Sequence, residues 1–204
     1  MEEEKTLTDE YERIRHSNDS EKLSRIARKD LKKEEVGEEE FAIRSALLEA
    51  VAANRATPKE DRVYLASSSP FPNILVRLST DEDYEVRKAV AANRASKNWL
   101  LSKLAKDEND EVKEAAIENP NSSWKAKLDA AQNPLSSPAL LRFLSQIGRE
   151  SEEGTKDFVL SSMVRSSSAR NPNCPEDALA ALVEDKSPEV RKTAEKRVSP
   201  DNVQ

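Results

Sequence analysis

Paired leucines and single valines recur along this chain at fixed distances and set its hydrophobic pattern. Counted from Asn93, Leu101 and Leu104 stand at +8 and +11, and Val112 stands at +19. Counted from Asn171, the same positions hold Leu179, Leu182 and Val190. Leucines three residues apart lie on one face of a helix, and the valine begins a second, amphipathic, alanine-rich helix. The pattern therefore predicts a unit of short helix, turn, longer helix and turn.

Three polar positions separate these predicted helices. Asn93 and Asn119 each follow an alanine-rich helix, and the interval between them sets the period of the repeat. We expect asparagine to end that helix, because it tolerates the left-handed conformation and bonds its own backbone. A proline near +4, such as Pro175, suits the first turn of the next helix. An aspartate at +14, such as Asp107, can accept backbone N–H bonds and start the longer helix.

The period is broken twice, from Asn54 to Ser68 and from Asn119 to Asn133, where the interval is little more than half as long. The two starts, Asn54 and Asn119, are as far apart in the sequence as the two ends, Ser68 and Asn133. This equality indicates either duplication of a larger unit or a chance likeness between helical sequences. Each interval is predicted to hold a single helix, at about 58–66 and about 122–132. In the first block, Ser67 or Ser68 takes the position of the asparagine.

Two further segments stand outside the regular pattern. We expect residues 1–40 to form a charged N-terminal segment with capping helices, because Leu23 and Ile26 lie three periods before Leu101 and Leu104. The repeat array is expected over 41–200, beginning with a helix at 40–53 whose inward residues are Ile43, Leu47, Leu48 and Val51. Within the array, 147–158 (IGRESEEGTKDF) is predicted to be an inserted surface loop, either on a binding face or without a role.

The string VRKAVAANRASKNWLLSKLAKD resembles the consensus of the leucine-rich repeat variant family, with its Val-Arg pair, alanine-rich helix, asparagine and paired leucines before aspartate. The resemblance covers about residues 41–200 and is most specific in 81–121 and 164–198. It implies an all-α, HEAT-like α-solenoid in which stacked α and 3₁₀ helices form a right-handed superhelix. Some members of the family carry an N-terminal iron–sulfur cluster, but this chain lacks the cysteines for it.

Composition favours a thin helical structure over a thick globular core. Hydrophobic residues make up 36% of the 204 residues and charged residues 35%, with only 3 glycines. A stack that buries one seam needs few apolar residues, so we expect an elongated, curved molecule with a radius of gyration above roughly 17 Å, the value for a compact domain of this size. No apolar run approaches the length of a membrane span, and we expect a cytoplasmic protein.

The sequence offers little catalytic chemistry. His16 is the only histidine and is expected on the charged surface, while Cys174 lies between Asn173 and Pro175 in a predicted turn. The chain has no glycine-rich phosphate loop and no spacing typical of metal ligands. We therefore expect no catalytic residues, no metal and no cofactor, and a protein that is not an enzyme.

A ladder of basic residues is the most suggestive candidate site. Its members each follow the valine of a longer helix: Arg87, Lys113, Arg165 and Arg191. Stacked helices would align them into a row that could contact a partner, a phosphate or the carboxylates of the neighbouring turns DEDYE and DENDE. Trp99 and Trp124 are further candidates for a binding hot spot, although we expect them to pack in the core or seam.

The net charge of −6 and the isoelectric point of about 5.2 decide between the functions that remain. We expect a non-catalytic scaffold for a protein or peptide partner of basic character, since repeat arrays offer extended surfaces. A structural or regulatory module of a larger complex is the second possibility. The third is a nucleic-acid-binding protein related in architecture to the HEAT-like DNA glycosylases, which the acidic charge disfavours.

Overall fold

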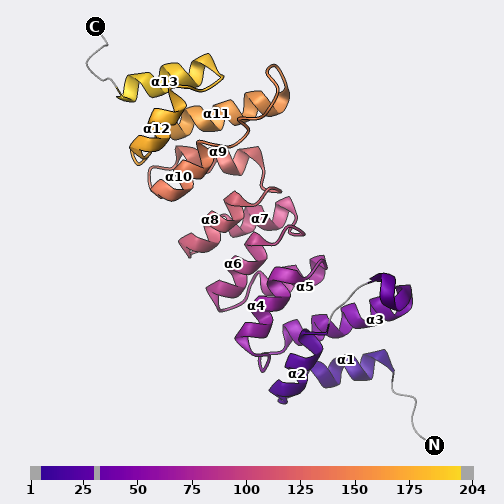
Figure 1. The fold of residues 1–204 in the computed structure, drawn as a ribbon. Helices are drawn as coiled ribbons and strands as arrows, with labels where there is room; N and C mark the ends of the chain where they lie inside the picture. The colour runs from indigo at the N-terminus through magenta and orange to yellow at the C-terminus, as the bar shows by residue number, and fades with distance from the viewer. Residues whose placement is uncertain (1–5, 30–32, 199–204) are drawn as a thin grey trace, which may run out of the picture. The chain divides into compact units, whose positions relative to one another are not determined.

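The computed structural model describes residues 6–29 and 33–198, and within these ranges all regular structure is α-helical (Figure 1). The predicted all-α class is confirmed. The described helices fall into two compact units, which we call unit 1 (up to Asn121) and unit 2 (from Ser122). The predicted boundary between the capping segment and the repeat array, at residue 40, lies inside the helix Lys33–Ala53. Residues 199 and 200 of the predicted array lie outside the described ranges.

Unit 1 contains eight helices within the described residues. They are α1 (Leu7–Arg15), α2 (Ser20–Ala27), α3 (Lys33–Ala53), α4 (Lys59–Ser68), α5 (Pro72–Leu78), α6 (Tyr84–Ala92), α7 (Asn98–Leu104) and α8 (Asp110–Glu118). Helix α3 packs on α1, α2 and α5, while α6 packs between α4 and α8. The helix predicted at 40–53 extends back to Lys33, with a kink at Gly37, whose φ of 73° suits glycine alone.

Unit 2 contains α9 (Trp124–Gln132), α10 (Pro138–Leu144), α11 (Lys156–Arg170), α12 (Glu176–Leu182) and α13 (Pro188–Val198). Helix α11 packs between α9 and α13. The predicted loop at 147–158 ends earlier than expected, since Thr155 caps α11 and accepts a hydrogen bond from the Phe158 amide. The 3₁₀ helices implied by the family resemblance do not occur among the described residues of either unit.

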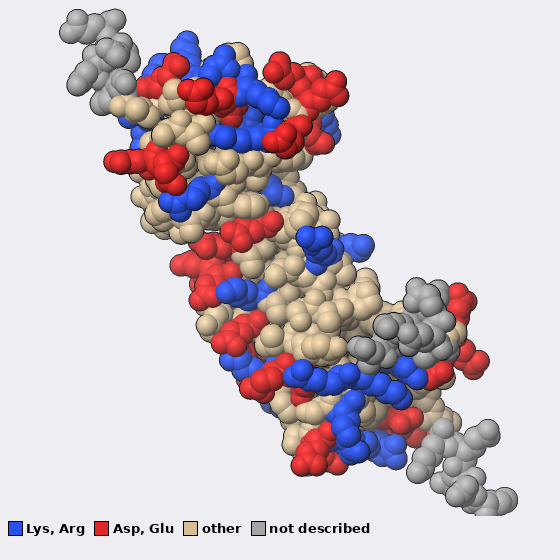
Figure 2. All heavy atoms as spheres, in the orientation of Figure 1, with Lys and Arg blue, Asp and Glu red and all other residues tan. Residues whose placement is uncertain are grey.

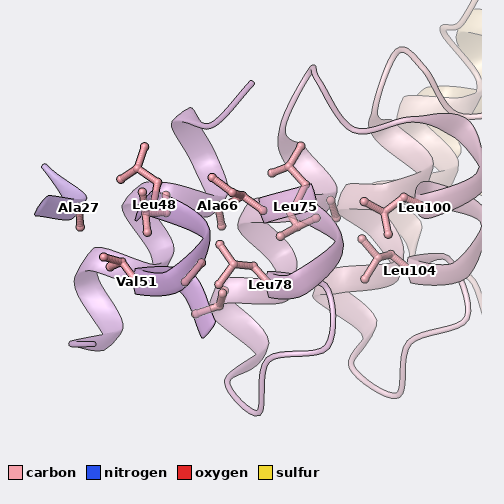
Figure 3. Packing of buried hydrophobic residues seen from close by; sticks show 14 of the residues in the cluster. Ala27, Leu48, Val51, Ala66, Leu75, Leu78, Leu100 and Leu104 are labelled. Carbon is pink, nitrogen blue, oxygen red and sulfur yellow. The ribbon is translucent and has the colours of Figure 1, made fainter. Parts of the chain in front are cut away.

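The paired leucines form the core, as their spacing predicts. Leu101, Leu104 and Val112 are each at most 2% exposed, and the same holds for Val86 and Val190. In unit 1 the buried side chains of successive helices follow one another in a continuous row, which includes Val51, Leu75, Leu78 and Leu104 (Figure 3). On α3, Leu48 and Val51 are buried, whereas Ile43 and Leu47 are only partly covered.

Both irregular intervals hold the single helices predicted for them, α4 and α9. The residue in the asparagine position of the first block is Ser69, however, rather than Ser67 or Ser68. Ser69 ends α4, and its hydroxyl accepts a hydrogen bond from the Phe71 amide at 3.2 Å. The prediction missed this position because a polar run of serines gives no local signal for the helix end.

A recurring geometry of asparagine side chains, which we call the asparagine joint, connects neighbouring repeats. The amide of Asn93 donates to the carbonyls of Ala66 (2.8 Å) and Ser69 (3.0 Å) at the end of α4, and its oxygen accepts from the Ala95 amide (2.8 Å). The same arrangement of two donated bonds and one accepted bond occurs at Asn54, Asn119 and Asn171. Each joint thereby satisfies carbonyls that the preceding helix leaves open.

The left-handed conformation expected at these asparagines is wrong. Asn93 has φ −66° and ψ 126°, and no residue other than glycine has a positive φ within the described ranges. The bond to its own backbone is present, as predicted, but the extended backbone directs the side chain towards the previous repeat. Asparagine therefore occupies this position for its paired donors and acceptor rather than for its tolerance of unusual backbone angles.

Candidate binding surface

Two residues of the basic ladder, Arg87 and Arg165, form bidentate pairs with aspartates. The Arg87 guanidinium donates to both carboxylate oxygens of Asp107, at 2.8 and 2.9 Å, and to the carbonyls of Asp81 and Glu82. In unit 2, Arg165 donates to both oxygens of Asp185, at 2.7 and 3.1 Å, and to the Ile147 carbonyl. Paired donors of this kind match a carboxylate in geometry as well as charge.

Burial separates these two arginines from solvent. Arg87 is 8% exposed and Arg165 is 0% exposed. The hydrogen bond from Arg87 lowers the pKa of the Asp107 carboxyl, and the same bond raises the pKa of Arg87. Since carboxylate and carbonyl oxygens already engage both guanidinium groups, the ion-pair interpretation of the ladder accounts for their geometry.

The other two ladder residues have different surroundings. The Lys113 amine lies 2.7 Å from a carboxylate oxygen of Asp110, in an exposed pair one helical turn away. Arg191 donates to the carbonyls of Asp185 and Lys186, at 2.6 and 2.9 Å. No aspartate follows Lys113 at the spacing that links Arg87 to its partner. The four residues thus share a position in the repeat but not a chemical environment.

Arg62 forms a bidentate pair of the same kind, which the sequence analysis missed. Its guanidinium donates to both oxygens of Asp81, at 2.8 and 3.2 Å, and to the Thr57 carbonyl at 2.7 Å. Arg62 lies in the first irregular interval, where no valine directly precedes the arginine. Arg62 and Arg165 precede the aspartate at +14 by the same number of residues as Arg87 precedes Asp107, to within one position. This spacing is a sequence signal that would have indicated Arg62.

Neither His16 nor Cys174 lies in a group of catalytic side chains. The His16 imidazole is 74% exposed and lies 3.2 Å from a carboxylate oxygen of Glu12. Cys174 is 7% exposed, and burial raises the pKa of its thiol to about 11. It stands three residues after Asn171, where the other joints place hydroxyl groups, such as that of Ser96, which donates to the Val90 carbonyl at 2.6 Å. Its position is therefore that of a small turn residue, as the sequence indicates.

The expectation that both tryptophans pack in the core is wrong for Trp99, whose exposure is 58%. Leu100, Leu101 and Leu104 occupy the buried side of α7, and the helical period turns Trp99 away from it. Trp124 is partly buried; its indole N–H donates to Asp157 at 3.3 Å, and the Lys127 amine lies 5.6 Å from its ring centre.

The turns before α6 and α8 carry several exposed carboxylates. The side chains of Glu108 and Asp110 are 89% and 86% exposed, and those of Glu85 and Glu111 about half exposed. Figure 2 shows acidic side chains gathered along this edge of α6 and α8. We call these turns, residues 82–85 and 108–111, the acidic edge.

A shallow pocket of about 560 Å³ opens at the acidic edge. Its lining includes the carboxylates of Glu82, Asp83 and Glu108 and the ring of Tyr84, which is 36% exposed. Arg87 also lines the pocket, where its guanidinium pairs with Asp107 and lies 3.4 Å from a carboxylate oxygen of Glu108. Lys59 pairs with Asp83 at 3.1 Å, which leaves Glu82 as the lining carboxylate with no ion pair among the described residues. Carboxylates beside an accessible aromatic ring suit a lysine or arginine side chain, through ion pairing and cation–π attraction.

Comparison with known proteins gives no match for this chain. No protein-family model matches the sequence, and neither a curated protein nor a solved structure gives a match. The roles of the residues above therefore rest on their geometry in this chain alone. Among the described residues, no three histidine, cysteine or acidic side chains are grouped to hold a metal ion, and no helix has the length and apolar character to cross a membrane.

Proposed function

We propose that this chain is a non-catalytic repeat protein that binds a basic protein or peptide. The observation that carries the proposal is the pocket at the acidic edge, which Glu82, Asp83 and Glu108 line together with the exposed Tyr84. A partner that inserts a lysine or arginine there would meet both attractive charge and a ring face. Because the pocket lies between the turns of successive repeats, a peptide could run along the edge and place several basic residues.

We also propose that each unit is a segment of a right-handed α-solenoid of the leucine-rich repeat variant type. The support is local: leucines at +8 and +11 are buried, the asparagine closes the longer helix, and the aspartate at +14 accepts a backbone N–H. The absence of 3₁₀ helices in the described residues is the feature that departs from the family pattern. A cytoplasmic location stays a prediction.

Affinity capture from native lysate, at low and at high salt, tests the binding function. The Glu82→Lys/Glu108→Lys double variant reverses two charges of the pocket, and Glu39→Lys/Glu60→Lys is the matched control on exposed residues elsewhere in unit 1. We expect basic proteins that the wild type and the control capture at low salt to be lost with the first variant. Equal capture by both variants, or capture that high salt leaves unchanged, would contradict the proposal.

Nucleic-acid binding remains the alternative function, and the geometry gives it less support. Duplex binding relies on basic side chains that can neutralise phosphates, whereas Arg87 and Arg165 are buried against aspartates. Titration of a labelled DNA duplex at physiological salt separates the two functions. A sub-micromolar dissociation constant would favour the alternative and contradict the expected absence of tight binding.

A further inference from the structure

A second recess in unit 1 has the opposite character to the acidic edge. It lies where α2 packs against α3, near the middle of α1, and has a volume of about 420 Å³. Ile26, Leu47 and Leu48 form an apolar floor, and Lys22, Arg25, Lys29 and Arg44 form a basic rim. We call this recess the basic groove. Figure 2 shows lysine and arginine side chains gathered in the part of unit 1 that contains these helices.

Most of the positive charge on the rim is uncompensated within the described residues. Arg44 pairs with Glu40, and the one carboxylate in the lining, that of Glu10, pairs with Arg13 at 3.5 Å. Lys22, Arg25 and Lys29 form no ion pair with the described residues, in contrast with the arginines of the bidentate pairs. Although the chain has a net charge of −6, the field of this cluster attracts an acidic ligand locally.

The spacing of the rim residues indicates the shape of that ligand. Lys22 and Arg25 lie three residues apart on α2, and Lys29 follows two residues after the end of that helix. Ile26 lies beside them on α2, and Leu47 faces them from α3. An apolar floor between two helices with a charged rim along one of them and its C-terminal turn is the arrangement that receives an amphipathic helix in a groove.

We propose that the basic groove binds an acidic amphipathic helix of a partner protein, with its apolar face on Ile26 and Leu47 and its carboxylates on the rim. A membrane surface fits less well, because binding to lipid requires apolar side chains that protrude, whereas Leu48 is 6% exposed and Ile26 is half-buried. The site is separate from the acidic edge, so either can be refuted without the other.

Fluorescence anisotropy with a synthetic peptide of about 14 residues tests the proposal, with leucine at i, i+3, i+4 and i+7 and glutamate on both flanks. One comparison peptide has the same composition in an order that mixes leucine and glutamate around the helix. Another replaces glutamate with lysine. We expect saturable binding of the first peptide that weakens with salt, and at least about ten-fold weaker binding of the other two.

Protein variants then locate the binding. Arg25→Glu/Lys29→Glu reverses two exposed rim charges, and Arg77→Glu/Lys103→Glu reverses two exposed charges on α5 and α7 as the control; none of the four forms an ion pair with another described residue. We expect at least about ten-fold loss of peptide affinity in the first variant and less than about two-fold in the control. Circular dichroism verifies that both variants fold.

Several results would overturn the proposal. They are equal binding of the ordered and mixed peptides, equal losses in the two variants, and absence of saturable peptide binding. Binding to phosphatidylserine vesicles that depends on Arg25 and Lys29, without peptide binding, would assign the groove to a membrane instead. Concentration-dependent dimerisation that the rim variant abolishes would assign it to a second copy of this chain.

Discussion

Replacing Asn93 with alanine removes one complete asparagine joint and should cost about 2–4 kcal/mol of unfolding free energy. Asn93 is 8% exposed and makes three hydrogen bonds, two donated to the carbonyls that end α4 and one accepted from the Ala95 amide. Each such bond contributes about 1 kcal/mol net, and carbonyls left buried without a donor add to the loss. Urea unfolding followed by circular dichroism measures the change in unfolding free energy from the shift of the midpoint concentration, provided that the dependence of the free energy on urea keeps the same slope.

Asn93→Asp gives a sharper test, because aspartate has the same shape but carries no amide donor. Its carboxylate would face two carbonyl oxygens, so its pKa in the folded state should rise above the value in the unfolded chain. Protonation then favours the folded state, and relative to wild type the variant should be less stable at pH 8 than at pH 5. At pH 5 the protonated carboxyl can restore one of the two donated bonds.

The matched control is Asn98→Ala, an exposed asparagine five residues away that should change stability by less than about 0.5 kcal/mol. Asn171→Ala removes the corresponding joint from unit 2 and reports on the unfolding of that unit. A loss below about 1 kcal/mol for Asn93→Ala, or an Asn93→Asp variant whose deficit is independent of pH, would refute the structural role assigned to the joint.

Three further substitutions test the core, the bidentate pair and the turn. Leu104→Ala should cost about 2–5 kcal/mol in urea unfolding, since Leu104 is 2% exposed, and a loss below about 1 kcal/mol would disprove the repeat register. Asp107→Asn should cost about 2–4 kcal/mol by leaving Arg87 buried without its carboxylate. The bond to Arg87 lowers the pKa of Asp107, so the wild-type ion pair stabilises the folded protein fully above the unfolded pKa of about 3.9. This contribution is lost as the pH falls through the pKa of the folded state. The unfolding free energies of wild type and Asp107→Asn should therefore converge in acid. Cys174→Ser should change the unfolding free energy by less than about 1 kcal/mol, because Ser96 occupies the same position in another repeat. The native thiol, with its pKa of about 11, should react slowly with a disulfide reagent at neutral pH. Rapid modification of the folded protein would contradict this.

Local periodicity predicted the helices well. Leucines three residues apart can be buried together only on a helix, so the positions of Leu101 and Leu104 indicated α7 and its buried face directly. The same period also places Trp99 on the opposite side of that helix, and the expectation of a packed tryptophan failed because it relied on residue type instead of the helical angle.

The contacts between repeats could not be predicted from the local sequence pattern. The side chain of Asn93 donates to the carbonyls of Ala66 and Ser69, which belong to the previous repeat, and this pairing requires knowing which helix ends lie together. The ion pairs were foreseen only in part: acidic turns beside a basic ladder suggested them, but not that Arg87 and Arg165 would be buried. The groove between α2 and α3 gave no sequence signal, because its rim and floor come from two helices with separate patterns.

The joint made by Asn93 has a consequence for how such a chain can lengthen. Its acceptors are main-chain carbonyls, which every preceding helix supplies whatever its side chains are. A copied segment that carries its own asparagine can therefore connect to an existing helix end without a matching change in the older sequence. The two single-helix intervals begin at Asn54 and Asn119 and end at Ser69 and Asn133, so their separations agree to within one residue, as either duplication of a larger unit or a chance likeness would give. For protein engineering, the same property makes the helix end before an asparagine the natural place to graft an additional repeat.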